Sequence, residues 1–160
     1  MHKFKRESAV QYALLWALRR NPAYRDFSGK AGGRGDCTNF ISQAMYAGGW
    51  PMTPGWWGDK KDAGSLWAAA SDFIDFIESI GRAKICTRDK LDLGDLVSMN
   101  PHGGRIFHIM IITGKNCGIQ GDELLYSCHT FDRQNRALSI PEGDGDTMCM
   151  YWKVADFFPI

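Results

Sequence analysis

The sequence predicts an α+β fold in which N-terminal helices pack on an antiparallel sheet. Up to Gly81, apolar residues recur at helical spacing, whereas the segments from Gly94 onward are short, apolar and rich in β-formers, with turn residues between them. Helices followed by strands are typical of this fold class. The chain has 160 residues and no internal repeat, low-complexity segment or linker, so a single domain spanning residues 1–160 is expected.

Three helices are expected in the first half of the chain. The first spans residues 5–20 and is stopped by Pro22. The second spans residues 37–46 and ends at a pair of glycines, the usual residues at a helix C-terminus. The third begins with a serine, a preferred N-cap residue, and spans residues 65–81.

Strands are expected where the apolar period changes to two residues or where short apolar runs are bounded by turns. The four segments are GDLVSM (94–99), FHIMIITG (107–114), ELLYSCHT (123–130) and TMCMYWKV (147–154).

Composition and charge exclude several classes of partner. The formal net charge is +1, so no broad basic surface favours nucleic acid. No segment is long and apolar enough for membrane insertion. The basic N-terminus followed by AVQYALLWAL is interrupted by Gln11 and Tyr12 and lacks a small-residue cleavage site, so an amphipathic helix is expected there instead of a signal peptide.

The five cysteines are an odd number, and no CxxC occurs, which favours free thiols over zinc or redox motifs. Cys37 stands out because it follows the glycine-rich segment GGRGD and begins a helix. A helix N-terminus lowers the pKa of a thiol, so Cys37 is the candidate nucleophile, against the simpler interpretation of a packed thiol.

Cysteine attack on a carbonyl requires an imidazole base and a group that orients the imidazole. His108 and His129 lie on consecutive predicted strands, where a hairpin can bring the rings side by side. One ring then serves as the base, and the other, or Asp132, holds it. The same residues with a cysteine also allow a zinc site, which no HExxH or CxxC spacing supports.

Three tryptophans, Trp50, Trp56 and Trp57, lie in a loop rich in glycine and proline after the cysteine helix. They are expected either to fold onto the core or to form an aromatic wall of a substrate groove.

Four segments, in order, resemble the putative amidase domain family of papain-like cysteine hydrolases, which includes the NlpC-type and CHAP-type cell-wall hydrolases. DCTNFISQAMYAGGWPM is similar to its signature, AVQYALLWALRRNPAYRDFSG to its leading helix, LGDLVSM…RIFHIMIITG to its histidine strand, and LLYSCHTFDRQNRAL to a further segment. The similarity extends from about Ala9 to Leu138.

The resemblance implies a papain-like α+β fold with Cys37 as nucleophile and His108 as base. In NlpC-type relatives a polar residue on the next strand orients the ring, and His129 matches that position, with Asp132 and Asn135 as rivals. Tyr24 is the nearest match to a tyrosine that helps line the oxyanion site.

The resemblance further implies a cysteine amidase or peptidase that cleaves bacterial peptidoglycan and requires no metal or organic cofactor. Without a recognised export signal, the expectation is synthesis in the cytoplasm and action in the periplasm or cell wall of a target bacterium, as a delivered antibacterial effector toxin or a lysin. A cognate immunity protein is then an expected partner. The alternatives are a papain-like hydrolase that acts on proteins and a non-catalytic binding module on the same scaffold.

Overall fold

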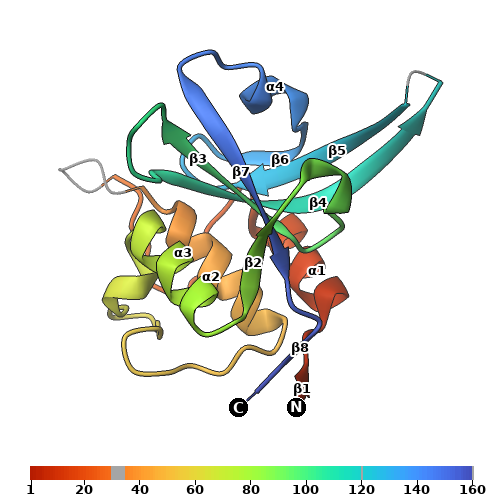
Figure 1. Ribbon diagram of the computed structural model, residues 1–160. Coiled ribbons are helices and arrows are strands. Elements are labelled where there is room, and N and C mark those ends of the chain that lie inside the picture. Colours follow the sequence, from red (N-terminus) through yellow and green to blue (C-terminus); the bar gives the residue numbers. More distant parts are fainter. Residues whose placement is uncertain (30–34, 120, 160) are drawn as a thin grey trace.

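A six-stranded antiparallel sheet forms the centre of the molecule, with three helices on one side (Figure 1). The computed structural model describes residues 1–29, 35–119 and 121–159. The strand order of the large sheet is β2-β7-β3-β4-β5-β6, and a separate two-stranded sheet pairs β1 with β8. The protein therefore has the α+β architecture that the sequence predicts, with helices in the first half of the chain and the sheet mainly in the second.

The α-helices of the described residues are α1 (Arg6–Trp16), α2 (Cys37–Ala47), α3 (Ala70–Ser79) and α4 (Ser139–Glu142). Two short 3-10 helices are η1 (Ser65–Trp67) and η2 (Arg88–Lys90). The strands of the large sheet are β2 (Ala83–Cys86), β3 (Leu96–Pro101), β4 (His108–Gly118), β5 (Gly121–Cys128), β6 (Arg133–Ala137) and β7 (Thr147–Val154). The two terminal strands are β1 (His2–Lys3) and β8 (Phe157–Phe158).

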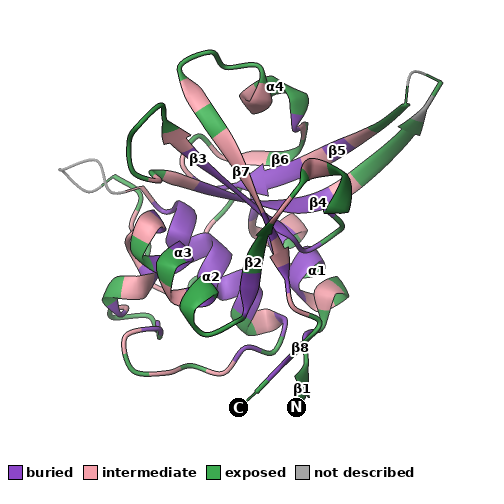
Figure 2. Ribbon diagram, in the orientation of Figure 1, coloured by how far each residue is buried: buried purple, intermediate pink, exposed green. Residues whose placement is uncertain are grey.

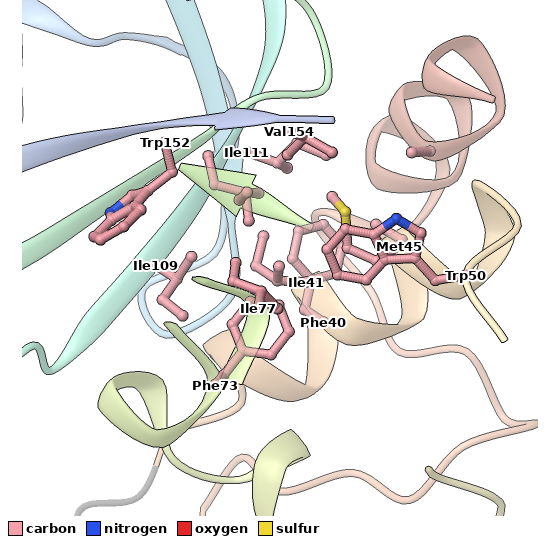
Figure 3. Packing of buried hydrophobic residues seen from close by; sticks show 14 of the residues in the cluster. Phe40, Ile41, Met45, Trp50, Phe73, Ile77, Ile109, Ile111, Trp152 and Val154 are labelled. Carbon is pink, nitrogen blue, oxygen red and sulfur yellow. The ribbon is translucent and has the colours of Figure 1, made fainter. Parts of the chain in front are cut away.

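Two apolar clusters lie on opposite faces of the sheet, as the alternation along β4 shows. Ile109 and Ile111 belong to the larger cluster, which packs against the helices, whereas Met110 and Ile112 belong to the smaller cluster on the other face. Figure 3 shows the larger cluster, in which Phe40 and Ile41 of α2 meet Ile109 of the sheet. Because α2 is almost entirely buried (Figure 2), its position relative to β4 is fixed by packing.

The predicted third helix is divided in the structure. A 3-10 turn at η1 is followed by Ala69 in an extended conformation (φ −120°, ψ 120°), and α3 starts only after it. The break lets Trp67 enter the core, where its ring lies 5.7 Å from Trp56 and 5.6 Å from Tyr24. Burial of a large aromatic ring here outweighs the continuity of a single helix.

The first helix is shorter than expected because its last carbonyl has other partners. The oxygen of Trp16 accepts hydrogen bonds from the N–H of Arg19 and from Nε2 of His129. Sequence analysis also missed β2 and β6, the two edge strands of the large sheet. Their exposed and half-buried polar residues lack the alternation that marks a half-buried strand.

Candidate active site

Cys37 begins α2 and lines a cavity of about 410 Å³. Its side chain is only 5 % exposed. The helix positions the thiol firmly, because the apolar side chains that follow in α2 are fully buried against the sheet. The backbone N–H of Ile109 on β4 hydrogen-bonds to the thiol, which fixes Cys37 beside the start of that strand.

His108 is the first residue of β4 and lines the same cavity as Cys37. Its Cα pairs with that of Met99 on β3, and strand alternation places its half-buried side chain on the face of Met110. The structure thus brings the candidate nucleophile and the candidate base to one cavity at the end of the sheet. The ring of Phe107 stacks 6.4 Å from that of His108, measured between centroids.

Burial controls the electrostatics of this pair. Desolvation raises the pKa of the Cys37 thiol, and the hydrogen bonds from Ile109 and Thr38 only partly oppose it. The expected lowering of this pKa by the helix N-terminus is therefore wrong, because desolvation is the larger effect. Burial also lowers the pKa of His108 to about 4. At neutral pH the resting pair is an uncharged thiol and an uncharged imidazole.

His129 does not lie beside His108. Its Nδ1 is 2.5 Å from a carboxylate oxygen of Asp36, and its Nε2 donates to the carbonyl oxygen of Trp16 at 2.8 Å. The ring stacks on Phe40 of α2 at a centroid distance of 4.1 Å. Since both ring nitrogens have partners, His129 has no nitrogen left to orient the base.

Sheet register explains why the two histidines separate. Ser127 pairs with Ile111, so His129, two residues further along, shares the helix-covered face with Ile111. His108 lies on the opposite face, with Met110. The expectation that both histidines face one groove is therefore corrected by the register.

The other candidates for orienting the base also have different partners. Asp132 forms a two-bond pair with Arg20, at 2.8 and 3.0 Å. Asn135 accepts a hydrogen bond from Thr113 through its amide oxygen. In the described part of the chain, neither ring nitrogen of His108 has a hydrogen-bond partner in the protein.

The predicted oxyanion tyrosine and the aromatic groove are also placed elsewhere. Tyr24 packs on Trp67 and does not line the cavity. Trp50 and Trp56 are 1 % and 0 % exposed and belong to the main core, so they form no groove wall. Trp57 is partly exposed but lies outside this cavity. Of the two expectations for the tryptophan loop, packing onto the core is confirmed for Trp50 and Trp56.

Sequence reasoning missed most of the cavity lining. The wall consists of apolar side chains from β3, β4 and β5, namely Met99, Met110, Tyr126 and Cys128. Two exposed phenylalanines, Phe107 and Phe131, also line it, as do Arg133 and Asp144. Alternation around His108 signals Met110, but the residues on β5 become visible only once the strand register is known.

The turn between β5 and β6 carries backbone strain at the cavity. Thr130 and Phe131 have φ values of 62° and 57°, a region that β-branched and aromatic residues rarely adopt. Gly35 lies so close to this turn that a Cβ there would be 2.0 Å from Oγ1 of Thr130. The Thr130 hydroxyl is buried and has no hydrogen-bond partner within the described part of the chain. Strain of this kind clusters at functional sites.

The zinc interpretation finds no support in the geometry. His108 and His129 lie on opposite faces of the sheet, and no group of three His, Cys, Asp or Glu side chains within residues 1–29, 35–119 and 121–159 is arranged to hold a metal ion.

Among the described helices, none has the length and hydropathy needed to cross a membrane.

A buried cysteine at the start of α2 and a histidine at the start of β4 thus line one cavity. Residues 3–152 match the family described as "Putative amidase domain", and the chain belongs to that family. Amide hydrolysis is the activity that this family description indicates.

Two proteins of Bacillus subtilis (strain 168) are similar to the chain. Uncharacterized protein YhbB is 30% identical over 156 residues, which cover 91% of this chain and 47% of that protein. Uncharacterized protein YjcM is 29% identical over 140 residues, covering 80% of this chain and 31% of that protein. The chain thus spans less than half the length of these relatives. No solved structure gives a significant match.

Proposed function

We propose that the protein is a cysteine amidase or peptidase that cleaves amide bonds in bacterial peptidoglycan. The observation that carries the chemistry is the meeting of Cys37 and His108 in one cavity, joined through the hydrogen bond from the Ile109 N–H to the thiol. Membership of the amidase family supports an amide substrate. The resemblance of the cysteine segment to cell-wall hydrolases favours peptidoglycan as its source.

The mechanism begins from the uncharged pair. As the Cys37 sulfur attacks the carbonyl carbon, neutral His108 accepts the thiol proton. The negative charge that develops on the carbonyl oxygen is stabilised by the backbone N–H of Cys37, which lies in the first turn of α2 and has no acceptor within the helix. The tetrahedral intermediate collapses when the C–N bond breaks and the leaving amine takes the proton from His108.

A thioester on Cys37 remains after the amine departs. His108, neutral again, accepts a proton from water as the water oxygen attacks the thioester carbonyl. The C–S bond then breaks, the thiolate recovers a proton, and the acid product leaves. This scheme uses a dyad, because His129, Asp132 and Asn135 all have other partners.

Peptidoglycan lies outside the cytoplasmic membrane. We therefore propose that the protein acts in the periplasm or cell wall of a target bacterium, as a delivered effector or a lysin. The effector role further requires an immunity protein in the producing cell, and we propose that this protein covers the cavity rim at Phe107 and Phe131.

A non-catalytic binding module is the second candidate. It is favoured by the raised pKa of Cys37, because a buried, protonated thiol is a weaker nucleophile. A single experiment separates the candidates: purified sacculi are incubated with the protein, and the released fragments are identified by mass spectrometry.

Cys37→Ala is expected to abolish fragment release, with a rate loss of roughly 10³-fold or more, because the nucleophile is gone. Cys117→Ala is the matched control, since Cys117 is exposed and lies outside the cavity, and it should retain the wild-type rate. Casein incubated in parallel reports on protein hydrolysis. Release of fragments from casein but not from sacculi would mean that the substrate is protein and not peptidoglycan. If neither is hydrolysed, the non-catalytic binding module is favoured.

A further inference from the structure

The cavity is lined by an arginine that has no carboxylate partner among the described residues. Arg133, at the start of β6, is half-buried, and among the described residues its guanidinium makes one hydrogen bond, from Nη1 to the carbonyl oxygen of Asp132 at 3.2 Å. Arg6 and Arg88, which are also partly buried, each form an ion pair at 2.7 Å. Buried Arg82 lies instead over the rings of Trp50 and Phe158. An arginine left without a carboxylate in a cavity is available for an external anion.

Arg133 is close to the candidate nucleophile. Its Cα pairs with that of Cys128 across β5 and β6, and its backbone N–H hydrogen-bonds to the Cys128 thiol. The same thiol lies within electrostatic range of Cys37. Cys128 is therefore next to Arg133 in the sheet and close to the sulfur proposed to attack the substrate, and all three residues line one cavity.

The remaining polar groups of the cavity are compatible with an anion beside Arg133. The buried Thr130 hydroxyl has no partner among residues 1–29, 35–119 and 121–159 and can donate a hydrogen bond. Asp144 also lines the cavity, but its carboxylate accepts the N–H of Asp146 and forms no ion pair with Arg133 among the described residues. The rest of the wall is mainly apolar.

We propose that Arg133 determines substrate specificity by binding a carboxylate that the substrate carries near the scissile carbonyl. The Thr130 hydroxyl supplies a second donor, and the apolar wall receives the aliphatic part of the same group. This inference rests on the proposed function of the cavity. The stem peptides of peptidoglycan offer such carboxylates beside their amide bonds, whereas most bonds of an ordinary protein do not.

The first test uses two thiol reagents and requires no hydrolysis. Iodoacetate and iodoacetamide differ in carrying a carboxylate or a neutral amide, and mass spectrometry of the Cys37 peptide gives the alkylation rate for each. The ratio of the iodoacetate rate to the iodoacetamide rate is expected to fall roughly tenfold in Arg133→Gln, because a charge-assisted hydrogen bond is lost. Arg133→Lys should retain part of the preference.

Arg136→Gln is the matched control, because Arg136 is an exposed arginine of the same strand that lies outside the cavity. Its rate ratio should equal that of the wild type. Arg133→Met provides a second neutral variant with a similar aliphatic stem if Arg133→Gln does not fold. An unchanged ratio in the folded neutral variants overturns the inference, whatever the protein hydrolyses.

The second test compares native sacculi with sacculi whose free carboxylates have been converted to amides. The wild type should release fragments from native sacculi roughly 10- to 100-fold faster, and Arg133→Gln should lose this difference. A muramidase that digests both preparations shows that the modified sacculi remain accessible. If the wild type digests both preparations equally, the role of Arg133 is contradicted. If it releases fragments from neither preparation, the proposed peptidoglycan activity is contradicted, and the alkylation ratio alone tests the role of Arg133.

Discussion

Desolvation is the dominant influence on the two catalytic candidates at the scale of single residues. It favours the neutral forms of both side chains, raising the pKa of Cys37 and lowering that of His108 to about 4. The two side chains are therefore a neutral thiol and a neutral imidazole, not a thiolate–imidazolium ion pair. Attack by the thiol requires His108 to accept its proton as a general base. The base is competent across the physiological pH range because it stays unprotonated there.

The pH dependence of hydrolysis follows from the His108 pKa. Below pH 4 the imidazole is protonated and cannot accept the Cys37 proton, so kcat/KM should rise with pH through about 4 and level off above it. The measurement is a pH–rate profile in which the folded fraction is checked at every point by circular dichroism. An ascending limb near pH 6.5, the ordinary value for histidine, would show that the His108 imidazole is solvated in the working enzyme.

His129 is expected to act through stability. His129→Ala breaks a buried pair with Asp36 and should lower the free energy of unfolding by about 3 kcal/mol. His108→Ala removes the base instead. It should lower kcat/KM by roughly 10²- to 10⁴-fold with little change in the free energy of unfolding. Urea unfolding and turnover per folded molecule are measured for both variants. Equal losses of turnover with no loss of stability in His129→Ala would restore His129 as a catalytic residue.

One β-bulge accounts for the position of His129 at the scale of elements. Gly114 pairs with Leu125, but Ile112 pairs with Tyr126, so the register of β4 and β5 shifts by one residue at Thr113. Suppose that the pairing of β4 and β5 seen between Gly114 and Leu125 continued past Thr113 without a bulge. His129 would then face the same side of the sheet as Met110 and His108. The extra residue instead turns it toward the helices, because a shift of one residue exchanges the two faces of a strand.

This bulge also marks how far the sequence can predict the site. Cys37 after a glycine-rich segment and His108 at a strand start are local signals, and the motif resemblance places them in order. The partner of His129 depends on a register shift inside a strand, which apolar alternation in HIMIITG does not reveal. The sequence did not indicate Arg133 either. Its position at the cavity follows from the pairing of β6 with β5, where Arg133 lies opposite Cys128.

Hydrogen bonds of Thr113 hold the bulge in place. Its hydroxyl lies 2.7 Å from the Ser127 hydroxyl and donates to the amide oxygen of Asn135 at 2.8 Å. Thr113→Val keeps the shape but removes both bonds, and we expect a loss of about 1–3 kcal/mol in the free energy of unfolding. Thr147→Val is the control, because the buried Thr147 hydroxyl has no partner among the residues that the structure describes, and it should be neutral or slightly stabilising. Equal effects of the two substitutions would mean that the Thr113 bonds do not stabilise the bulge.

A buried carboxylate joins distant parts of the chain at the scale of the whole molecule. Asp95, which is fully buried just before β3, pairs with Arg6 of α1 at 2.7 Å and with Lys153 of β7 at 2.8 Å. It also accepts the backbone N–H groups of Val154 and Asp92. The helix α1, the centre of the sheet and strand β7 therefore depend on one side chain, which the sequence presents only as part of a Gly-Asp pair.

Asp95→Asn is expected to destabilise the entire fold by about 3 kcal/mol, because it leaves two cations short of their counter-charge. For a chain of this size that loss corresponds to a fall in Tm of roughly 6–12 °C. Asp72→Asn is the control: it removes an exposed pair with Arg105 and should cost less than about 1 kcal/mol. Calorimetry measures both, and turnover of Asp95→Asn well below its Tm should stay near the wild-type value, because Asp95 does not line the catalytic cavity. If Asp95→Asn melted like Asp72→Asn, the two ends of the chain would be held to the sheet by apolar packing alone.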